Sequence, residues 1–193
     1  MENSTMARAT PAATNGKHDR GDSNDISGIR DFDFFHGRWH IANRRLVARL
    51  QGCTEWEEFE ASGHARPLPA GIGNYDDFVP TTWKPGFVGM SLRIFNPQTG
   101  LWSIYWLENK TGGLSTAGTL LPPVVGKFSG GVGIFEGEDE LDGRPIRVRF
   151  TWSDISATSA RWEQAMSADG GLTWESNWVM LHTREQSGAG VQA

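Results

Sequence analysis

Apolar and polar residues alternate along most of the chain between residues 28 and 185. The alternation is clearest over 145–153 and 160–167, where large apolar side chains occupy every second position. Because successive residues of a strand point to opposite faces, this pattern predicts half-buried β-strands. Helical periodicity is weak, and only residues 29–36 are predicted to form a short helical turn. The pattern therefore predicts an all-β domain.

Turn residues divide the alternating region into short strands. Residues 96–100 place a proline and a glycine where a turn prefers them, and Asp142-Gly143 is a favourable hairpin dipeptide. The predicted strands cover 38–49, 55–62, 74–78, 88–95, 101–107, a weaker segment after Gly113, 124–128, 132–137, 145–153, 160–167 and 173–184. About ten antiparallel strands joined by short turns predict an up-and-down barrel, with a sandwich as the alternative.

The last predicted hairpin contains a recognisable turn motif. Residues 167–174, Ser-Ala-Asp-Gly-Gly-Leu-Thr-Trp, fit the S-x-D-x-G-x-T-W pattern of an Asp-box. Asp169 can accept backbone hydrogen bonds, the two glycines tolerate positive φ, and Trp174 is expected to fold back over the turn. Asp-boxes recur in sialidase propellers, but a propeller needs several blades of roughly 40–50 residues. A single copy predicts a hairpin, not a glycosidase.

Alternation also assigns the two faces of the predicted sheet. The predicted interior set is Met90, Leu92, Ile94, Trp102, Ile104, Trp106, Ile146, Val148, Phe150, Trp152, Trp162, Met166, Trp174, Trp178 and Met180. The predicted exterior set is Ser91, Arg93, Ser103, Tyr105, Arg147, Arg149, Thr151, Arg161, Glu163, Glu175 and Asn177. Burying one large apolar side chain contributes about 1.5–3 kcal/mol, so exchanging the faces would be very unfavourable.

Length and composition fit one domain over 28–185, flanked by a predicted disordered tail over 1–27 and a flexible tail over 186–193. The 9 Trp and 10 Phe residues suffice for a core or a lined cavity. A net charge of −5 without a basic stripe disfavours nucleic-acid binding. No segment has the apolar character of a signal peptide or a membrane helix, which predicts a cytoplasmic protein without a membrane partner.

Several polar residues share the predicted interior face. Asn43 and Arg45 lie an even number of residues after Trp39, so they share its face of the predicted strand. In the same way Gln164 shares a face with Trp162, and His182 with Trp178. Buried polar groups are costly unless they are paired. Arg45, Gln164 and His182 are therefore predicted to satisfy one another or to hold a ligand's carboxylate, carbonyl or hydroxyl. The alternative is that Arg45 and His182 meet solvent at strand ends.

Other candidate chemistry is weak. His36 and His40 have the spacing of two zinc ligands on a helix, but Gly37 and the strand that follows break that geometry, so no metal site is predicted. The Asp76-Asp77 pair is interpreted as part of a polar loop.

A family resemblance rests on an ordered set of segments. Residues 32–39, Phe-Asp-Phe-Phe-His-Gly-Arg-Trp, resemble the G-x-W motif at the first strand of lipocalins, fatty-acid-binding proteins and nitrobindins. The chain resembles a bacterial family of lipocalin-like domains of unknown function. Besides this motif, the resemblance rests on residues 43–46, 56–59, 71–74, 91–97, 102–106, 122–126, 149–152 and 161–178. The resemblance covers about residues 30–184 and implies a calycin-type barrel. Nitrobindins continue as G-x-W-x-G-x-G, and the later glycines are absent here, which disfavours haem.

The leading hypothesis is a protein that binds a small apolar or aromatic molecule in a cavity lined by Trp and Met, with a completely filled interior as the alternative. The predicted ligand-binding residues are Trp39, Asn43, Arg45, Trp102, Trp106, Phe150, Trp152, Trp162, Gln164, Trp178 and Met180. A second hypothesis is a cofactor-independent isomerase, cyclase, lyase or decarboxylase with His182 as general acid–base. Haem binding is a further alternative. No cofactor is predicted, and a homodimer is left open.

Overall fold

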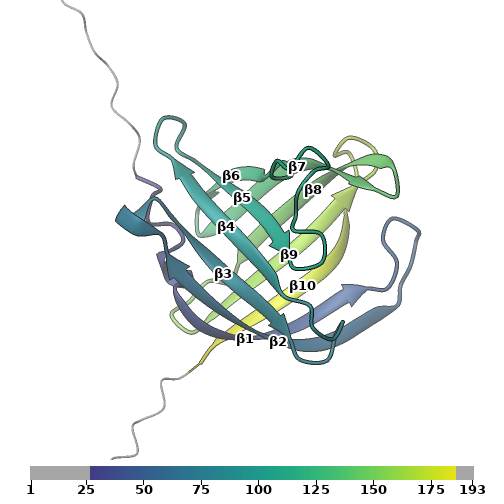
Figure 1. Ribbon diagram of the computed structural model, residues 1–193, viewed down its shortest axis with the longest axis horizontal. Helices are drawn as coiled ribbons and strands as arrows, with labels where there is room; N and C mark the ends of the chain where they lie inside the picture. The colour runs from purple at the N-terminus through teal and green to yellow at the C-terminus, as the bar shows by residue number, and fades with distance from the viewer. Residues whose placement is uncertain (1–26, 186–193) are drawn as a thin grey trace, which may run out of the picture.

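Ten strands form a closed antiparallel barrel in a computed structural model that describes residues 27–185 (Figure 1). They are β1 (Gly37–Leu46), β2 (Trp56–Pro67), β3 (Gly73–Pro80), β4 (Gly89–Asn96), β5 (Leu101–Glu108), β6 (Val124–Ser129), β7 (Val132–Leu141), β8 (Arg144–Ser153), β9 (Ser159–Ser167) and β10 (Glu175–Arg184). Each strand pairs with its sequence neighbours, and β1 also pairs with β10. The predicted all-β up-and-down barrel is confirmed, in place of the sandwich.

Elements outside the barrel are short. A 3₁₀ turn, η1 (Asp33–Phe35), replaces the longer helical turn predicted over 29–36, and η2 (Pro69–Gly71) lies between β2 and β3. The weak strand predicted after Gly113 is reduced to an isolated bridge between Leu114 and Leu120. Within residues 27–185 no helix has the length and apolar character to cross a membrane. Tails were predicted over 1–27 and 186–193; residues 1–26 and 186–193 lie outside the described residues.

The residues before β1 close one end of the barrel. Phe32 and Phe35 are almost fully buried, and the Phe32 ring packs edge-on against Trp102 with 4.9 Å between centroids. The Trp39 indole N–H donates to the Phe35 carbonyl at 2.7 Å. Arg184, at the end of β10, donates to the backbone carbonyls of residues 34 and 36. Ring packing and backbone hydrogen bonds together hold this plug in place.

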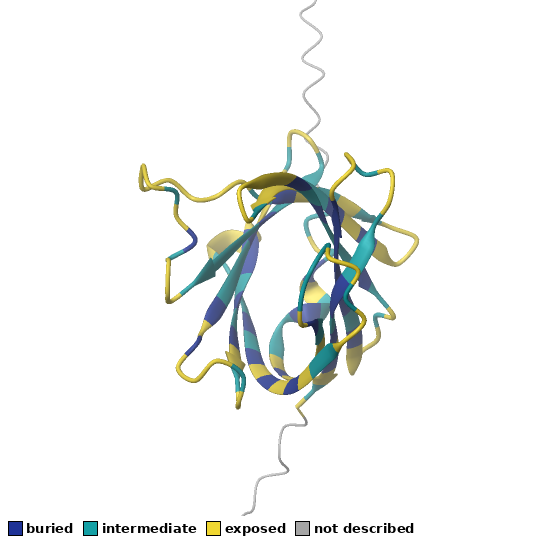
Figure 2. Cartoon of the chain, turned by 90° about the vertical axis from the view of Figure 1, so that its right-hand side faces the viewer, coloured by how far each residue is buried: buried dark blue, intermediate teal, exposed yellow. Residues whose placement is uncertain are grey.

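Burial alternates along the strands, as Figure 2 shows for the whole barrel. The predicted faces of β5, β8 and β9 are correct, but the prediction for β4 is wrong. Arg93 is only 3% exposed, and Met90, Leu92 and Ile94 lie on the outer face. Arg93 pairs in register with Ile104 of β5, an interior residue, so the two share a face. Because apolar residues occur on both faces of β4, alternation did not show which face is buried, and the outer face was predicted to be the inner one.

The prediction for the start of β10 is also wrong. A β-bulge between Ser176 and Trp178 shifts the register, and Asn177 becomes fully buried and not solvent-exposed. Trp174 precedes the strand and lies outside the barrel, where its ring centroid is 3.8 Å from the Arg149 guanidinium carbon. A bulge changes which face each following residue occupies, so regular alternation could not predict either placement.

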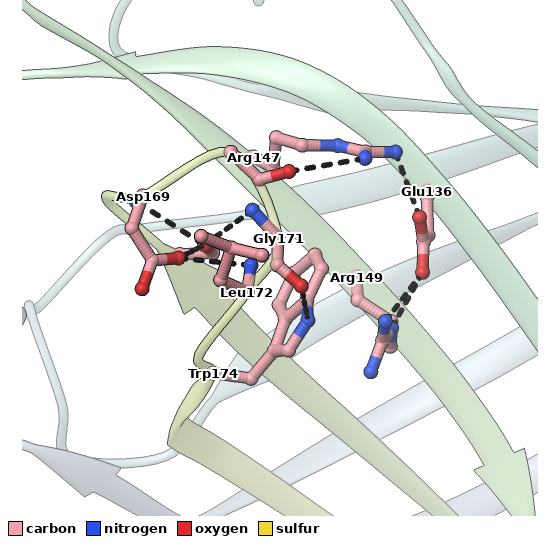
Figure 3. Close-up of polar contacts among 9 residues, drawn as sticks. Glu136, Arg147, Arg149, Asp169, Gly171, Leu172 and Trp174 are labelled. Atoms are coloured by element: carbon pink, nitrogen blue, oxygen red, sulfur yellow. Dashed lines mark hydrogen bonds and ion pairs between the residues drawn. The ribbon is translucent and has the colours of Figure 1, made fainter.

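The Asp-box forms the predicted turn between β9 and β10 (Figure 3). The Asp169 carboxylate accepts the backbone N–H groups of Leu172 and Thr173 at 3.0 and 2.9 Å. The hydroxyl and N–H of Thr173, together with Ser167, hold the pKa of Asp169 well below its usual range. The Trp174 indole N–H donates to the Gly171 carbonyl at 3.0 Å, so the ring folds back as predicted. This network fixes an exposed hairpin and adds nothing to the barrel interior.

Candidate functional site

The barrel encloses a cavity of about 210 Å³. Its apolar wall consists of Phe35, Ile41, Phe78, Ile104, Trp106, Trp152, Trp162, Met166, Trp178 and Met180. Its polar side chains are Arg49, Asp76, Ser91, Arg93, Asp139, Gln164 and His182. The aromatic lining was predicted, whereas most of the polar lining was not. The cavity is therefore amphipathic, not uniformly apolar.

Six of the predicted ligand-binding residues line this cavity, and so does the catalytic candidate His182. The six are Trp106, Trp152, Trp162, Gln164, Trp178 and Met180. Two others, Trp39 of β1 and Trp102 of β5, are fully buried against the plug and do not line the cavity. Phe150 packs behind the lining, with its ring 4.9 Å from that of Trp162. These three residues support the cavity from outside.

Asn43 and Arg45 do not line the cavity, but both contact Trp178, which does. The Asn43 side-chain carbonyl accepts the Trp178 indole N–H at 3.0 Å and thereby orients that ring. Arg45 lies near the mouth, where its guanidinium is within 5.4 Å of the ring centroids of Trp83 and Trp178 and pairs with Glu57 at 2.9 Å. The predicted cluster of Arg45 with Gln164 and His182 is therefore not formed.

A buried ion pair forms the polar side of the cavity. Arg93 Nη1 donates to Asp76 at 2.5 Å and to the Asn74 side-chain carbonyl at 3.0 Å. The interpretation of Asp76 as a loop residue is wrong, because it lies within β3 and is 7% exposed. Burial raises the pKa of the Asp76 carboxyl, and the charge of Arg93 opposes that shift. The alternation of Asn74, Asp76 and Phe78 on one face was the available signal in the sequence.

His182 lies beside this pair in an aromatic environment. Its ring centroid is 5.3 Å from those of Trp152 and Phe35, and its Nδ1 has no hydrogen-bond partner among the described residues. Burial, reinforced by the charge of Arg93, lowers the pKa of His182 to about 3. The imidazole is therefore neutral at physiological pH, a poor state for a general acid.

A second hollow, which we call the vestibule, adjoins the cavity at the mouth of the barrel. It is lined by Arg45, Arg49, Trp83, Lys84, Phe87, Trp106, Glu108, Lys110, Thr111 and Trp178. Arg49, Trp106 and Trp178 line both spaces. The connections at this end, including residues 47–55 after β1, lie at the right of Figure 1, opposite the plug. The sequence pattern placed Arg49 at a strand end and gave no sign of this position.

Comparison with known proteins adds little beyond the fold. No protein-family model and no curated protein sequence matches the chain. Among solved structures, the chain is similar to a redesigned β-barrel at 10% sequence identity and a TM-score of 0.43, over 81% of this chain and 96% of the other. A likeness this distant carries no functional argument. The lipocalin-like resemblance and a bacterial origin therefore stay predictions.

Proposed function

We propose that the protein binds a small molecule with an apolar or aromatic body and at least one hydrogen-bonding group. The observation that carries this proposal is the amphipathic cavity, where indole rings face a buried Arg93–Asp76 pair. Ligand pockets are typically apolar with a few placed polar groups. At about 210 Å³ the space fits a compact ligand.

The polar residues have hydrogen-bonding atoms to spare. Arg93 makes both of its hydrogen bonds through Nη1, and its buried Nε has no partner among the described residues. Gln164 donates through Nε2 to Asn177, and its side-chain carbonyl accepts no hydrogen bond from residues 27–185. A donor and an acceptor are thus available on residues that line the cavity. A hydroxyl, carbonyl or amide on the ligand is complementary to both.

A filled, purely structural barrel is less consistent with this interior. Burying an ion pair is expensive, and well-packed apolar residues of similar volume often stabilise a protein as well or better. Arg93 and Asp76 beside an unfilled space are better explained by ligand recognition than by stability alone.

Native mass spectrometry of the purified protein, beside a denatured control, tests for a bound ligand. We expect a stoichiometric extra mass that disappears on denaturation. An absorbance scan from roughly 250 to 700 nm distinguishes a haem by its Soret band from an aromatic organic ligand. A clean apo mass that persists after incubation with a panel of small aromatic compounds would contradict the proposal.

The enzyme hypothesis depends on His182 and is the weaker candidate, because an imidazole with its pKa lowered to about 3 is uncharged near neutrality and too weak a base to take up a proton. His182→Ala separates the two functions. A binding protein keeps its affinity within several-fold, whereas an enzyme that uses this residue as acid–base loses turnover by about a hundredfold or more with binding retained.

A further inference from the structure

Two guanidinium groups line the cavity, and they differ in charge compensation. Arg93 faces Asp76 at 2.5 Å, and both side chains are almost fully buried. A ligand anion placed beside Arg93 would also approach the Asp76 carboxylate, and the buried group of three would carry a net negative charge. Like charges at close range in a buried site are strongly unfavourable. The inner end of the cavity therefore suits a neutral polar group better than an anion.

Arg49 is different. It is half-buried, and it makes no hydrogen bond and no ion pair with any residue between 27 and 185. Burial and the nearby charge of Arg45 lower its pKa, while Asp142, Asp139 and Glu175 act in the opposite direction. An arginine stays charged under such perturbations. Arg49 is thus a partly desolvated cation whose five N–H donors have no partner within the described part of the chain.

The backbone around Arg49 holds it over the mouth. Residues 47–55 connect β1 to β2, and the Leu50 backbone N–H donates to the Glu175 carboxylate of β10 at 2.7 Å. The Val47 N–H donates to the Glu55 carbonyl at 3.1 Å and closes the base of the connection. These contacts place Arg49 on the boundary between the cavity and the vestibule, together with Trp106 and Trp178.

The vestibule is locally positive in a chain whose net charge is −5. It is lined by the four cationic residues Arg45, Arg49, Lys84 and Lys110 and by one acidic residue, Glu108. The Glu108 carboxylate accepts the backbone N–H groups of Lys110 and Thr111, at 2.5 and 2.7 Å, and the Thr111 hydroxyl. These hydrogen bonds leave the Glu108 carboxylate charged, and Arg45 is already paired with Glu57. Against these two carboxylates the lining carries four cations, so the excess positive charge favours an anion.

We propose that the ligand is an organic anion whose apolar body enters the cavity between the indole rings and whose carboxylate, sulfonate or phosphate pairs with Arg49. This inference rests on the proposed function and names the class of ligand. Trp106 and Trp178 line both spaces and give the apolar body a continuous surface from the mouth inward. The planar guanidinium of Arg49 can bind a carboxylate or phosphate through two parallel hydrogen bonds.

Two fluorescent probes with the same ring system test the assignment. 8-Anilinonaphthalene-1-sulfonate carries a negative charge, and N-phenyl-1-naphthylamine is its neutral counterpart. Dissociation constants are measured for both probes with the wild-type protein and with Arg49→Gln. We expect the variant to weaken the sulfonate by about tenfold or more and the neutral probe by less than about twofold. Raising the salt concentration should weaken only the sulfonate.

Arg44→Gln is the matched control, because it removes the same charge from the outer face of β1, where Arg44 is exposed and pairs with Glu58. We expect it to change neither affinity by more than about twofold. If Arg49→Gln affects both probes equally, or neither, the anion assignment is overturned while cavity binding stands. If neither probe binds the wild-type protein, the cavity proposal fails, and the anion site fails with it.

Discussion

The two ends of the barrel use the same residue types for opposite purposes. At the plugged end Arg93 is buried among Phe32, Phe35 and Trp152 and is neutralised by Asp76. At the mouth Arg49 is half-buried and has no ion-pair partner among the residues of the described barrel. Aromatic rings lie against cations at both ends, against Arg93 at the plugged end and against Arg45 and Lys84 at the mouth, but burial and counter-charge differ.

The comparison shows how a barrel can combine stability with binding. The plugged end satisfies its charge within the protein, so its aromatic packing contributes mainly to folding. The mouth leaves its positive charge to be satisfied from outside, so its arginine is available for recognition. Substitutions at the plugged end should therefore change the free energy of unfolding most, and those at the mouth should change the affinity for an anion most.

The largest expected effect is on the buried ion pair. Asp76→Ala leaves Arg93 buried and uncompensated, and we expect a loss of about 3–5 kcal/mol in the free energy of unfolding, measured by urea denaturation. Asp77→Ala is the control on the outer face of β3, where Asp77 pairs with the partly exposed Arg66 at 3.1 Å. Its loss should be about 1 kcal/mol. Equal losses would mean that the two faces are energetically alike.

The aromatic residues of the two ends should also differ. Phe32→Ala removes a ring that is 1% exposed, and the resulting cavity should reduce the free energy of unfolding by about 3–4 kcal/mol. Trp83→Ala, at the partly exposed mouth, should cost about 1–2 kcal/mol in urea denaturation. Trp83→Ala should also weaken binding of the sulfonate probe. The folded fraction of Phe32→Ala should bind that probe as the wild-type protein does. A greater loss of stability for Trp83→Ala would reverse the comparison.

His182 predicts a pH dependence of stability. Its pKa falls from an ordinary 6.5 to about 3 on folding, so the neutral form is favoured in the native state. This contribution is fully present above pH 6.5 and declines as the pH falls towards 3, by about 1.4 kcal/mol per pH unit. Between about pH 7 and pH 4.5, the urea midpoint of His182→Gln should therefore fall less than that of the wild-type protein.

The exposed His40 provides the control for this experiment, because it lies on the outer face of β1 beside Glu60. His40→Gln should keep the wild-type pH profile. An unchanged slope in His182→Gln would show that another group controls acid stability.

The smallest effect is expected at the Asp-box, outside both ends of the comparison. Asp169→Ala removes the carboxylate that accepts the N–H groups of Leu172 and Thr173, so the melting temperature should fall at neutral pH. Because folding depresses the pKa of Asp169, its contribution is present above pH 3.8 and is lost as the pH falls further. Scanning calorimetry at two pH values measures the difference.

Leu172→Ala is the control, because it changes an 86% exposed position in the same turn and should leave the melting temperature unchanged. A lower melting temperature in that variant would implicate the turn backbone instead.

The strand order could be predicted because it depends on local patterns. Alternation and turn residues are properties of neighbouring positions, and sequential antiparallel strands with short connections leave few arrangements besides a barrel. The Asp-box turn was predictable for the same reason, since Asp169, Gly171 and Trp174 interact within eight residues of sequence. The aromatic wall followed from the faces of β5, β8 and β9.

The polar half of the site depended on contacts between distant segments. Arg93 could face inward only because β3 places Asp76 and Asn74 beside it, and β4 by itself carries apolar residues on both faces. Asn177 is buried because a bulge changes its face. Arg49 reaches the mouth because its connection is bound to Glu175 of β10. The strands and their order follow from the sequence alone, since periodicity is local. Which charges are compensated follows from the folded barrel, because a counter-charge comes from another strand.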